Sequence, residues 1–248
     1  MSDARLKRRL ELEKMMGVDA LVKGGGAGAV RAEAGPPAAK GVPGEVPAAL
    51  ASIEEEVRRC TKCLLHKTRT QGVFARGRCD AELMFIGEGP GAEEDRLGQP
   101  FVGRAGKLLD KMIEAMGLGR DDAYVANIVK SRAANYAAGG APENRPPTPD
   151  EIRACWPYLE RQIELVKPRI IVTLGAPASN TLLGRDASMA DLRGRWFSYE
   201  GIPVLPTYHP AYLLRSPGEK AKAWQDLKKV VLALRGVIKP EPTPTGLF

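Results

Sequence analysis

Two groups of side chains carry residue types that could do chemistry. One is the glycine-rich and acidic loop GEGPGAEED, which runs from Gly87 to Asp95 and directly follows the apolar run Leu83–Ile86. The other is the pair Cys60 and Cys63, spaced as C-x-x-C. Open α/β sheets bind ligands where a buried strand ends in such a loop, and C-x-x-C is a spacing that chelates iron or zinc. We therefore expect a ligand site at the loop and weigh a metal site at the cysteines.

The glycine spacing at 87–92 formally satisfies the dinucleotide-binding pattern G-x-G-x-x-[GA]. Two features argue against a dinucleotide. The acids of the loop would crowd a pyrophosphate with negative charge, and Gly98, Pro100 and Gly103 delay the helical pattern until about Arg104. A carboxylate-rich loop, with Glu88 at its start, is better suited to polarising a water or supporting a cationic intermediate. The alternative is that the acids simply cap a short helix.

Three further residues stand where predicted strands end or loops interrupt the apolar pattern. Phe101 is either a core plug or a stacking platform for a planar base. Asn127, near the end of an apolar segment, either satisfies its own amide or offers a donor and an acceptor to a ligand edge. His209 follows the last predicted strand, where it could hydrogen-bond developing negative charge.

The segment after His209 has two interpretations. Leu213 and Leu214 beside Arg215 could form an apolar wedge next to a phosphate contact, as base-extruding proteins need. The alternative is a helix start with two core leucines. Of the remaining cysteines, Cys155 lies on a predicted helix and Cys79 just before the first predicted strand.

Strands and helices alternate along the chain, which predicts how these residues are brought together. Buried strands are expected at 83–87, 123–129, 169–175 and 203–208, with helices at 103–116, 149–166, 176–183 and 217–234 and another beginning at Pro47. This alternation predicts a three-layer α/β/α sandwich with a four-stranded parallel central sheet.

Composition sets the domain limits and the class of partner. Residues 1–48, rich in Gly, Ala and Pro after a short charged start, are expected to be a disordered arm and linker, followed by one domain over 49–236 and an extended tail over 237–248. The formal charge of +7 favours a polyanionic partner such as nucleic acid. No signal peptide or membrane span is evident, so we expect a cytoplasmic protein whose cysteines stay reduced.

Taken together, these motifs resemble those of the family 4 uracil-DNA glycosylases, which carry a [4Fe-4S] cluster. The resemblance spans about 53–234 and rests on CTKCLLHKTRTQ at 60–71, GEGPGAEEDRLGQPFVGRAGKLLDK at 87–111, YVANIVKSR at 124–132, PTPDEIRAC at 147–155, PRIIVTLGAPA at 168–178, LRGRW at 192–196 and YHPAYLLRSP at 208–217. It implies excision of uracil from single- or double-stranded DNA by hydrolysis of the N-glycosidic bond, in a monomer associated with the nucleoid.

The resemblance also implies roles for individual residues. Glu88 and Glu94, with Gly89, would form the loop that holds the catalytic water and the uracil. Phe101 would stack on the flipped base and Asn127 would recognise its N3 and O4 edge. His209 would stabilise the charge on O2 of the departing uracil, and the 213–215 turn would enter the gap left by the base.

Two departures from the family pattern concern the cluster and one loop. Cys60, Cys63 and Cys155 match cluster ligands, but Ser131 stands where the family has another cysteine. The fourth ligand is then Ser131, or Cys79 if the fold brings it near, or the site is an engineered or degraded one; we favour Cys79 as a packing residue that binds no cluster. The loop at 132–147 is longer than usual, as in a related branch that traps DNA covalently through a loop histidine.

The 132–147 loop has no histidine, so the sequence predicts turnover rather than a covalent adduct. Asn144 with Arg145 matches an asparagine-arginine pair near the substrate, although Asn135 competes for that alignment. The alternative to an enzyme is a non-catalytic or covalently trapping iron–sulfur relative that binds uracil-DNA.

Overall fold

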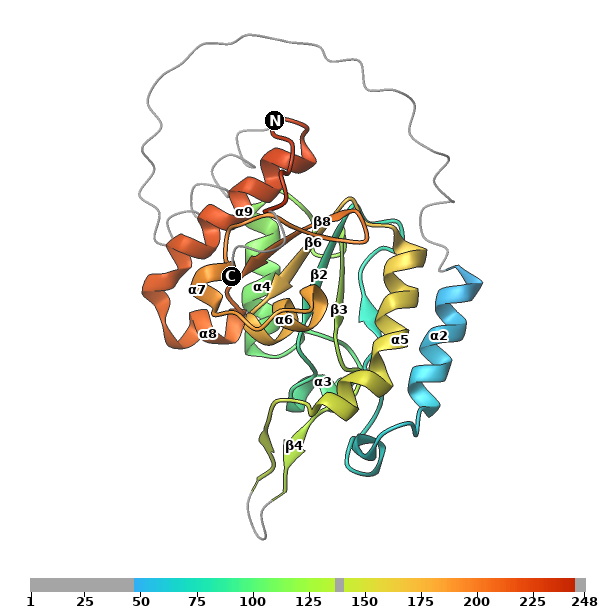
Figure 1. Ribbon diagram of the computed structural model, residues 1–248. Helices are drawn as coiled ribbons and strands as arrows, with labels where there is room; N and C mark the ends of the chain where they lie inside the picture. The colour runs from blue at the N-terminus through green and yellow to red at the C-terminus, as the bar shows by residue number, and fades with distance from the viewer. Residues whose placement is uncertain (1–46, 137–140, 244–248) are drawn as a thin grey trace.

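A computed structural model describes residues 47–136 and 141–243, and it forms a mostly parallel sheet between two layers of helices. The expectations for the arm before residue 47 and for the last five residues lie outside these ranges. Figure 1 shows α4 (Arg104–Ala115) and α9 (Lys220–Leu234) on one side of the sheet, and α5 (Pro149–Val166) and α2 (Ala48–Arg59) on the other. The predicted three-layer α/β/α sandwich is confirmed.

The sheet has the strand order β1-β3-β2-β6-β8-β7. Its four central strands are parallel and correspond to the four predicted ones: β3 (Ala123–Asn127), β2 (Leu83–Gly87), β6 (Ile170–Leu174) and β8 (Ile202–Thr207). Two short antiparallel strands, β1 (Ala75–Arg76) and β7 (Phe197–Tyr199), extend its edges. Neither edge strand was predicted, since two or three residues give too short a pattern.

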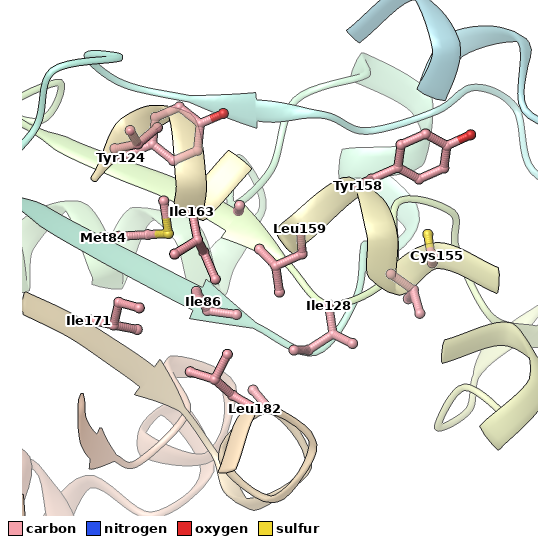
Figure 2. Packing of buried hydrophobic residues seen from close by; sticks show 14 of the residues in the cluster. Met84, Ile86, Tyr124, Ile128, Cys155, Tyr158, Leu159, Ile163, Ile171 and Leu182 are labelled. Carbon is pink, nitrogen blue, oxygen red and sulfur yellow. The ribbon is translucent and has the colours of Figure 1, made fainter. Parts of the chain in front are cut away.

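Alternating side chains of each central strand enter two separate cores, as the period of two in a strand requires. On β2, Leu83 and Phe85 pack with α4 and α9, whereas Met84 and Ile86 pack with α5 on the other face. Figure 2 shows the second core, where Ile163 of α5 lies over β2. Because both faces of the strands are covered, their sequences are continuously apolar.

Shorter elements complete the chain and lie mostly near the carboxyl ends of the central strands. They are η1 (Leu64–Lys67), α3 (Ala92–Leu97), the hairpin of β4 (Ala134–Asn135) and β5 (Glu143–Asn144), α6 (Ala176–Leu183), α7 (Met189–Leu192), α8 (Pro210–Arg215) and η2 (Pro217–Glu219). In Figure 1 the β4 hairpin projects beyond α3.

Two sequence expectations need correction. The helical pattern was expected only from about Arg104, but α3 already begins at Ala92 and carries Glu93, Glu94 and Asp95 in its first turn. The tail was expected to be extended and solvated, but Ile238 packs against the first core and the backbone N–H of Thr243 bonds the carbonyl of Trp196 at 2.6 Å.

Candidate active site

The candidate site lies where the central parallel strands end. Gly87 and Asn127 are paired in register at the ends of β2 and β3, and His209 follows β8 by two residues. Two cavities of about 370 and 330 Å³ open at this edge, and both are lined by Gly89, Asn144 and His209. Parallel strands place their carboxyl ends at one edge of a sheet, so residues distant in sequence converge there.

The sequence-predicted residues divide between these two cavities. Glu88, Arg145 and Arg215 line the larger one. Glu94, Phe101 and Asn127 line the smaller one. The structure therefore brings together every predicted catalytic and substrate-binding residue, and of the three predicted DNA-contacting residues only Arg215 lines a cavity.

Phe101 is held in a strained backbone conformation with φ of 54°, a region that bulky residues rarely occupy. Gly106 makes this possible, because a Cβ there would lie 1.9 Å from the Phe101 carbonyl oxygen. The ring is 5% exposed, and its centroid lies 5.7 Å from that of His209 at an interplanar angle of 33°. The Phe101 ring is thus held in place as one wall of the smaller cavity, where a planar ligand could stack on it.

Asn127 is 2% exposed, yet its Oδ1 has no hydrogen-bond partner within the described part of the chain. The side chain lies against Gly87, where a Cβ would come within 2.5 Å of Oδ1 and 2.6 Å of the Phe101 ring. A buried amide oxygen without a partner is costly unless a ligand supplies the donor. Asn127 is therefore poised to accept a hydrogen bond beside the Phe101 ring.

The two loop carboxylates have different environments. Both oxygens of Glu94 accept backbone hydrogen bonds: Oε1 from Val102 and Gly103 at 2.9 and 2.8 Å, and Oε2 from Gly91 at 3.2 Å. Glu94 therefore ties α3 to the segment that carries Phe101. Glu88, by contrast, has a buried Oε1 with no partner among the described residues, and burial raises the pKa of this carboxyl. Of the two, Glu88 is the one available to a water or a cation.

His209 caps the amino end of α8, and its Nδ1 accepts the backbone N–H of Ala211 at 3.1 Å. Burial, aided by the positive charge of Arg215, lowers the pKa of His209 to about 4. The imidazole is thus neutral at neutral pH, with its proton on Nε2. Since His209 lines both cavities, it can donate a hydrogen bond without carrying a charge.

Asn144 reaches both cavities from the β4–β5 hairpin and is oriented by a neighbour that sequence reasoning missed. Arg132 Nε donates to Asn144 Oδ1 at 2.7 Å, and its Nη2 donates to the Pro142 carbonyl at 2.8 Å. The amide oxygen of Asn144 is thereby occupied, which leaves Nδ2 as the group that can donate to a ligand. The only signal in the sequence was the position of Arg132 at the start of the 132–147 loop.

Helix α8 places the three residues at 213–215 in different surroundings. Leu213 is fully buried in the first core, Leu214 packs partly against that core, and Arg215 is exposed. Tyr212, also exposed, lines the larger cavity, and its ring lies 5.0 Å from that of Tyr208. In this conformation Leu213 is a core residue, and the side chains at the rim are Tyr212 and Arg215.

A second cluster lies where Cys60, Cys63 and Cys155 face Ser131 around one small space. Cys79 does not line that space; it precedes β2 and so lies at the opposite end of the sheet. Two of the thiols accept backbone N–H groups: Cys155 Sγ from Lys130 at 3.1 Å and Cys60 Sγ from Lys62 at 3.5 Å.

Ser131 Oγ accepts a hydrogen bond from Arg69 at 2.8 Å, and burial raises the pKa of Cys155 to about 11. Over the described ranges, no group of three or more His, Cys, Asp or Glu side chains is arranged to hold a metal ion. An iron–sulfur cluster differs from a single ion in that its ligands are spread over several irons. By donor chemistry, three thiols and a hydroxyl fit such a cluster.

The fold and the site define an α/β protein with a cavity lined by an aromatic ring and amide and imidazole side chains at the carboxyl edge of its sheet. The sequence profile of the Uracil DNA glycosylase superfamily matches residues 74–228. A type-4 uracil-DNA glycosylase of Thermotoga maritima is 42% identical over 184 residues, which cover 73% of this chain and 88% of that protein. One of Saccharolobus solfataricus is 44% identical over 191 residues, covering 73% and 85%. The chain belongs to the type-4 uracil-DNA glycosylases of this superfamily.

Proposed function

We propose that this protein excises uracil from DNA by hydrolysing the N-glycosidic bond, which leaves an abasic site. The observation that carries the proposal is the buried, unpartnered Oδ1 of Asn127 beside the ring of Phe101. A uracil stacked on that ring presents an N3–H donor to Oδ1, and the Asn127 amide nitrogen can donate to O4. Family membership supports the same substrate.

The same asparagine explains discrimination against cytosine. At N3 cytosine has a lone pair instead of a proton, and at C4 it has an amino group instead of an oxygen. Cytosine in this pocket would leave Asn127 Oδ1 without a donor. Its C4 amino group would also face the Asn127 side-chain N–H, so that one hydrogen-bond donor would meet another. When an analogue leaves buried polar groups of such a site unpaired, the site discriminates against it by a large factor in reaction rate.

Bond cleavage places positive charge on the sugar and negative charge on the departing uracil. The neutral His209 would donate from Nε2 to O2 of the leaving base, in a position fixed beforehand by its bond to Ala211. The Glu88 carboxylate, which is free of protein partners at Oε1, would orient the attacking water and favour the sugar cation. Glu94 would contribute by holding the Phe101 segment in place.

DNA is the expected partner, and the charge of +7 supports this. The exposed rim of the larger cavity, with Tyr212 and Arg215, is where the strand would lie. None of the described helices is long and apolar enough to cross a membrane. We further propose a monomeric enzyme that works on single- and double-stranded DNA in the cytoplasm, associated with the nucleoid.

The test of the proposed function is release of uracil from single- and double-stranded oligonucleotides, scored as abasic product. Asn127→Ala should lower the single-turnover rate by roughly 10²-fold or more without a matching loss of stability. Asn180→Ala is the control, because the side chain of this asparagine bonds the Ala187 backbone and lies outside both cavities.

A wild-type protein that yields no abasic product from either substrate contradicts the proposal. The alternative of a non-catalytic or covalently trapping relative makes a different prediction. In that case, product would stop at or below one equivalent of protein, or an adduct would survive denaturation. We expect many turnovers, since residues 132–147 offer no histidine for such a trap.

We also propose that Cys60, Cys63 and Cys155 bind a [4Fe-4S] cluster, with Ser131 rather than Cys79 at the fourth position. The shared space, the N–H groups directed at two of the sulfurs and the burial of Ser131 support this. The cluster would link the segment after α2 to α5 and has no part in the bond cleavage described above.

Iron content and visible absorption after anaerobic purification test the cluster independently of activity. The wild type should carry up to about four irons per chain, and Cys155→Ala should lose them. Ser131→Cys should retain iron longer in air, while Cys79→Ala should behave as the wild type. Iron-free wild-type protein, or iron lost on changing Cys79 but kept on changing Cys155, would contradict this assignment.

A further inference from the structure

Lys130 is a buried lysine that neither the proposed chemistry nor the core packing explains, and burial lowers its pKa to about 7. It follows β3 by three residues and is 1% exposed, among the largest fully buried side chains of the described ranges. Removing an ammonium group from water costs several kcal/mol per ion even after the protein relaxes. Such a group persists only where its hydrogen bonds and position serve the structure around it.

The hydrogen bonds of the Lys130 side chain connect the end of β3 to helix α5. Nζ donates to the backbone carbonyl of Asn127 at 2.8 Å and to Gln162 Oε1 at 2.5 Å. Gln162, itself fully buried on α5, donates from Nε2 to the hydroxyl of Tyr124 at 2.9 Å. Both acceptors of the ammonium are neutral oxygens, so this is a hydrogen-bonded anchor rather than an ion pair.

The turn that carries Asn127 is therefore fixed from two directions. On the side of β2, the backbone N–H groups of Ile128 and Val129 bond the carbonyls of Gly87 and Glu88. On the side of α5, the Lys130 ammonium joins the Asn127 carbonyl to Gln162. Without the Lys130 side chain, the Asn127 carbonyl would lose its link to α5, while the bonds to β2 would remain.

Asn127 needs this support because its own side chain makes little contribution to holding the amide in place. Its Oδ1 has no partner in the described structure, so no side-chain bond at that atom fixes the amide before a ligand enters. The amide must nevertheless meet the base edge in one orientation. Misplacement of a recognising group by about 1 Å can cost roughly 10²-fold in rate.

We propose that Lys130 is a positioning residue for base recognition: its buried amino group fixes the backbone of Asn127 against helix α5 and so sets the place of the amide in the pocket. This inference rests on the proposed function, because it concerns how the same pocket recognises its base. It assigns to Lys130 a specificity role that acts through Asn127 alone.

The experiment is a double-mutant cycle with Lys130→Met, which keeps the length of the side chain and removes its hydrogen bonds. We would measure single-turnover uracil excision and the Kd of free uracil for the wild type, K130M, N127A and the double variant. K130M alone should lose roughly 10- to 100-fold in rate. In the N127A background the same change should cost less than about twofold, because the group on which it acts is gone.

Two further variants separate positioning from plain stability. Gln162→Leu removes the anchor on α5 without touching Asn127 and should lower the rate in the same direction. Arg76→Met removes a different buried cation, paired with Asp110 away from the cavities, and should lower the melting temperature but leave the rate of the folded protein within about twofold. Iron content should be equal in K130M and the wild type, because the Lys130 backbone N–H that bonds Cys155 remains.

The results separate the two proposals. If the wild type excises uracil but K130M loses no rate, or loses the same factor in rate in the wild-type and N127A backgrounds, the role of Lys130 is overturned and the proposed function stands. A wild type that does not excise uracil overturns the proposed function itself. If N127A turns over too slowly to time, the uracil Kd values carry the cycle, and a K130M protein that binds uracil as the wild type does contradicts the proposal.

Discussion

His209 and Glu88 must both be deprotonated to act, but burial shifts their pKa values in opposite directions. Burial favours the neutral form of each side chain, so the pKa of His209 falls to about 4 while that of Glu88 rises. His209 must be neutral to act as an uncharged donor, and Glu88 must be ionised to orient water. Lowering the pH therefore inactivates Glu88 first.

The first prediction concerns the acid side of the pH–rate profile. Excision should fall as pH drops through the raised pKa of Glu88, above the ordinary glutamate value of about 4.3, and no step should follow an ordinary histidine pKa of about 6.5. Glu88→Gln should remove the acid limb and lower the rate by roughly 10²-fold or more. Single-turnover rates from about pH 4.5 to 9 test this, and a limb near the ordinary histidine value that disappears in His209→Asn would contradict it.

His209 also affects stability with a defined sign. Its folded-state pKa of about 4 lies below the unfolded value, so the folded state binds fewer protons than the unfolded state. The stability that this provides is fully present above the unfolded pKa of about 6.5 and is lost as pH falls toward the folded value. The melting temperature of His209→Asn should consequently depend less on pH across that window.

Among single residues, the site residues at strand ends could be predicted from the sequence. Residues whose burial depends on how the elements pack could not. Asn127 and His209 stand at the ends of apolar runs that are visible in the sequence, whereas Phe101 stands in a loop rich in glycine and proline. All three line the smaller cavity. Leu213 carries no mark that distinguishes core from surface, and only the packing of α8 buries it. Lys130 was missed because nothing in its type shows that its ammonium would point inward.

At the scale of elements, the central strands and long helices were predicted nearly to the residue. The strands are covered on both faces, so their sequences are continuous apolar runs bounded by glycine and polar residues. Helix α5 spans the predicted range, and the hydroxyl of its N-cap Thr148 accepts the backbone N–H of Glu151. Helix α3 was considered only as an alternative, because six residues between glycines show too little periodicity to predict a helix.

The end of β2 gives the third prediction, since Gly87 contacts two site residues at once. In Gly87→Ala the new methyl would fall 2.5 Å from Asn127 Oδ1 and 2.6 Å from the Phe101 ring. The added carbon should destabilise the protein by about 1–3 kcal/mol and lower excision far more than that loss explains, because both recognition groups must move.

Chemical denaturation and single-turnover kinetics on the same preparations would test the Gly87 prediction. Gly218→Ala is the matched control, since a Cβ there meets nothing within 4 Å. It should leave both stability and rate close to those of the wild type. A Gly87→Ala protein with wild-type excision would mean that Asn127 and Phe101 tolerate displacement.

On the scale of the whole molecule, the candidate site lies at the carboxyl edge of the sheet, and the space lined by Cys60, Cys63 and Cys155 lies close to it in the chain through residues 127–132. Residues 127–132 connect these two regions, because Asn127 lines the smaller cavity while Ser131 faces the cysteines. The overall α/β/α arrangement followed from the alternation of elements, whereas the contact between these two regions did not. That contact depends on how α5 crosses the end of β3, which sequence periodicity does not encode.

The net charge of +7 leads to the last prediction, which concerns how binding depends on salt. Each phosphate neutralised by a lysine or arginine releases counterions, so log K falls linearly with log of the salt concentration, by about 0.9 per contact on duplex DNA. Arg215 is exposed at the rim of the larger cavity, and Arg215→Ala should flatten this slope by about one. Arg153→Ala, an exposed arginine on α5 that lines neither cavity, should leave the slope unchanged. A Kd series on abasic-site duplex, which cannot turn over, measures both, and equal slopes for Arg215→Ala and the wild type would exclude a phosphate contact at Arg215.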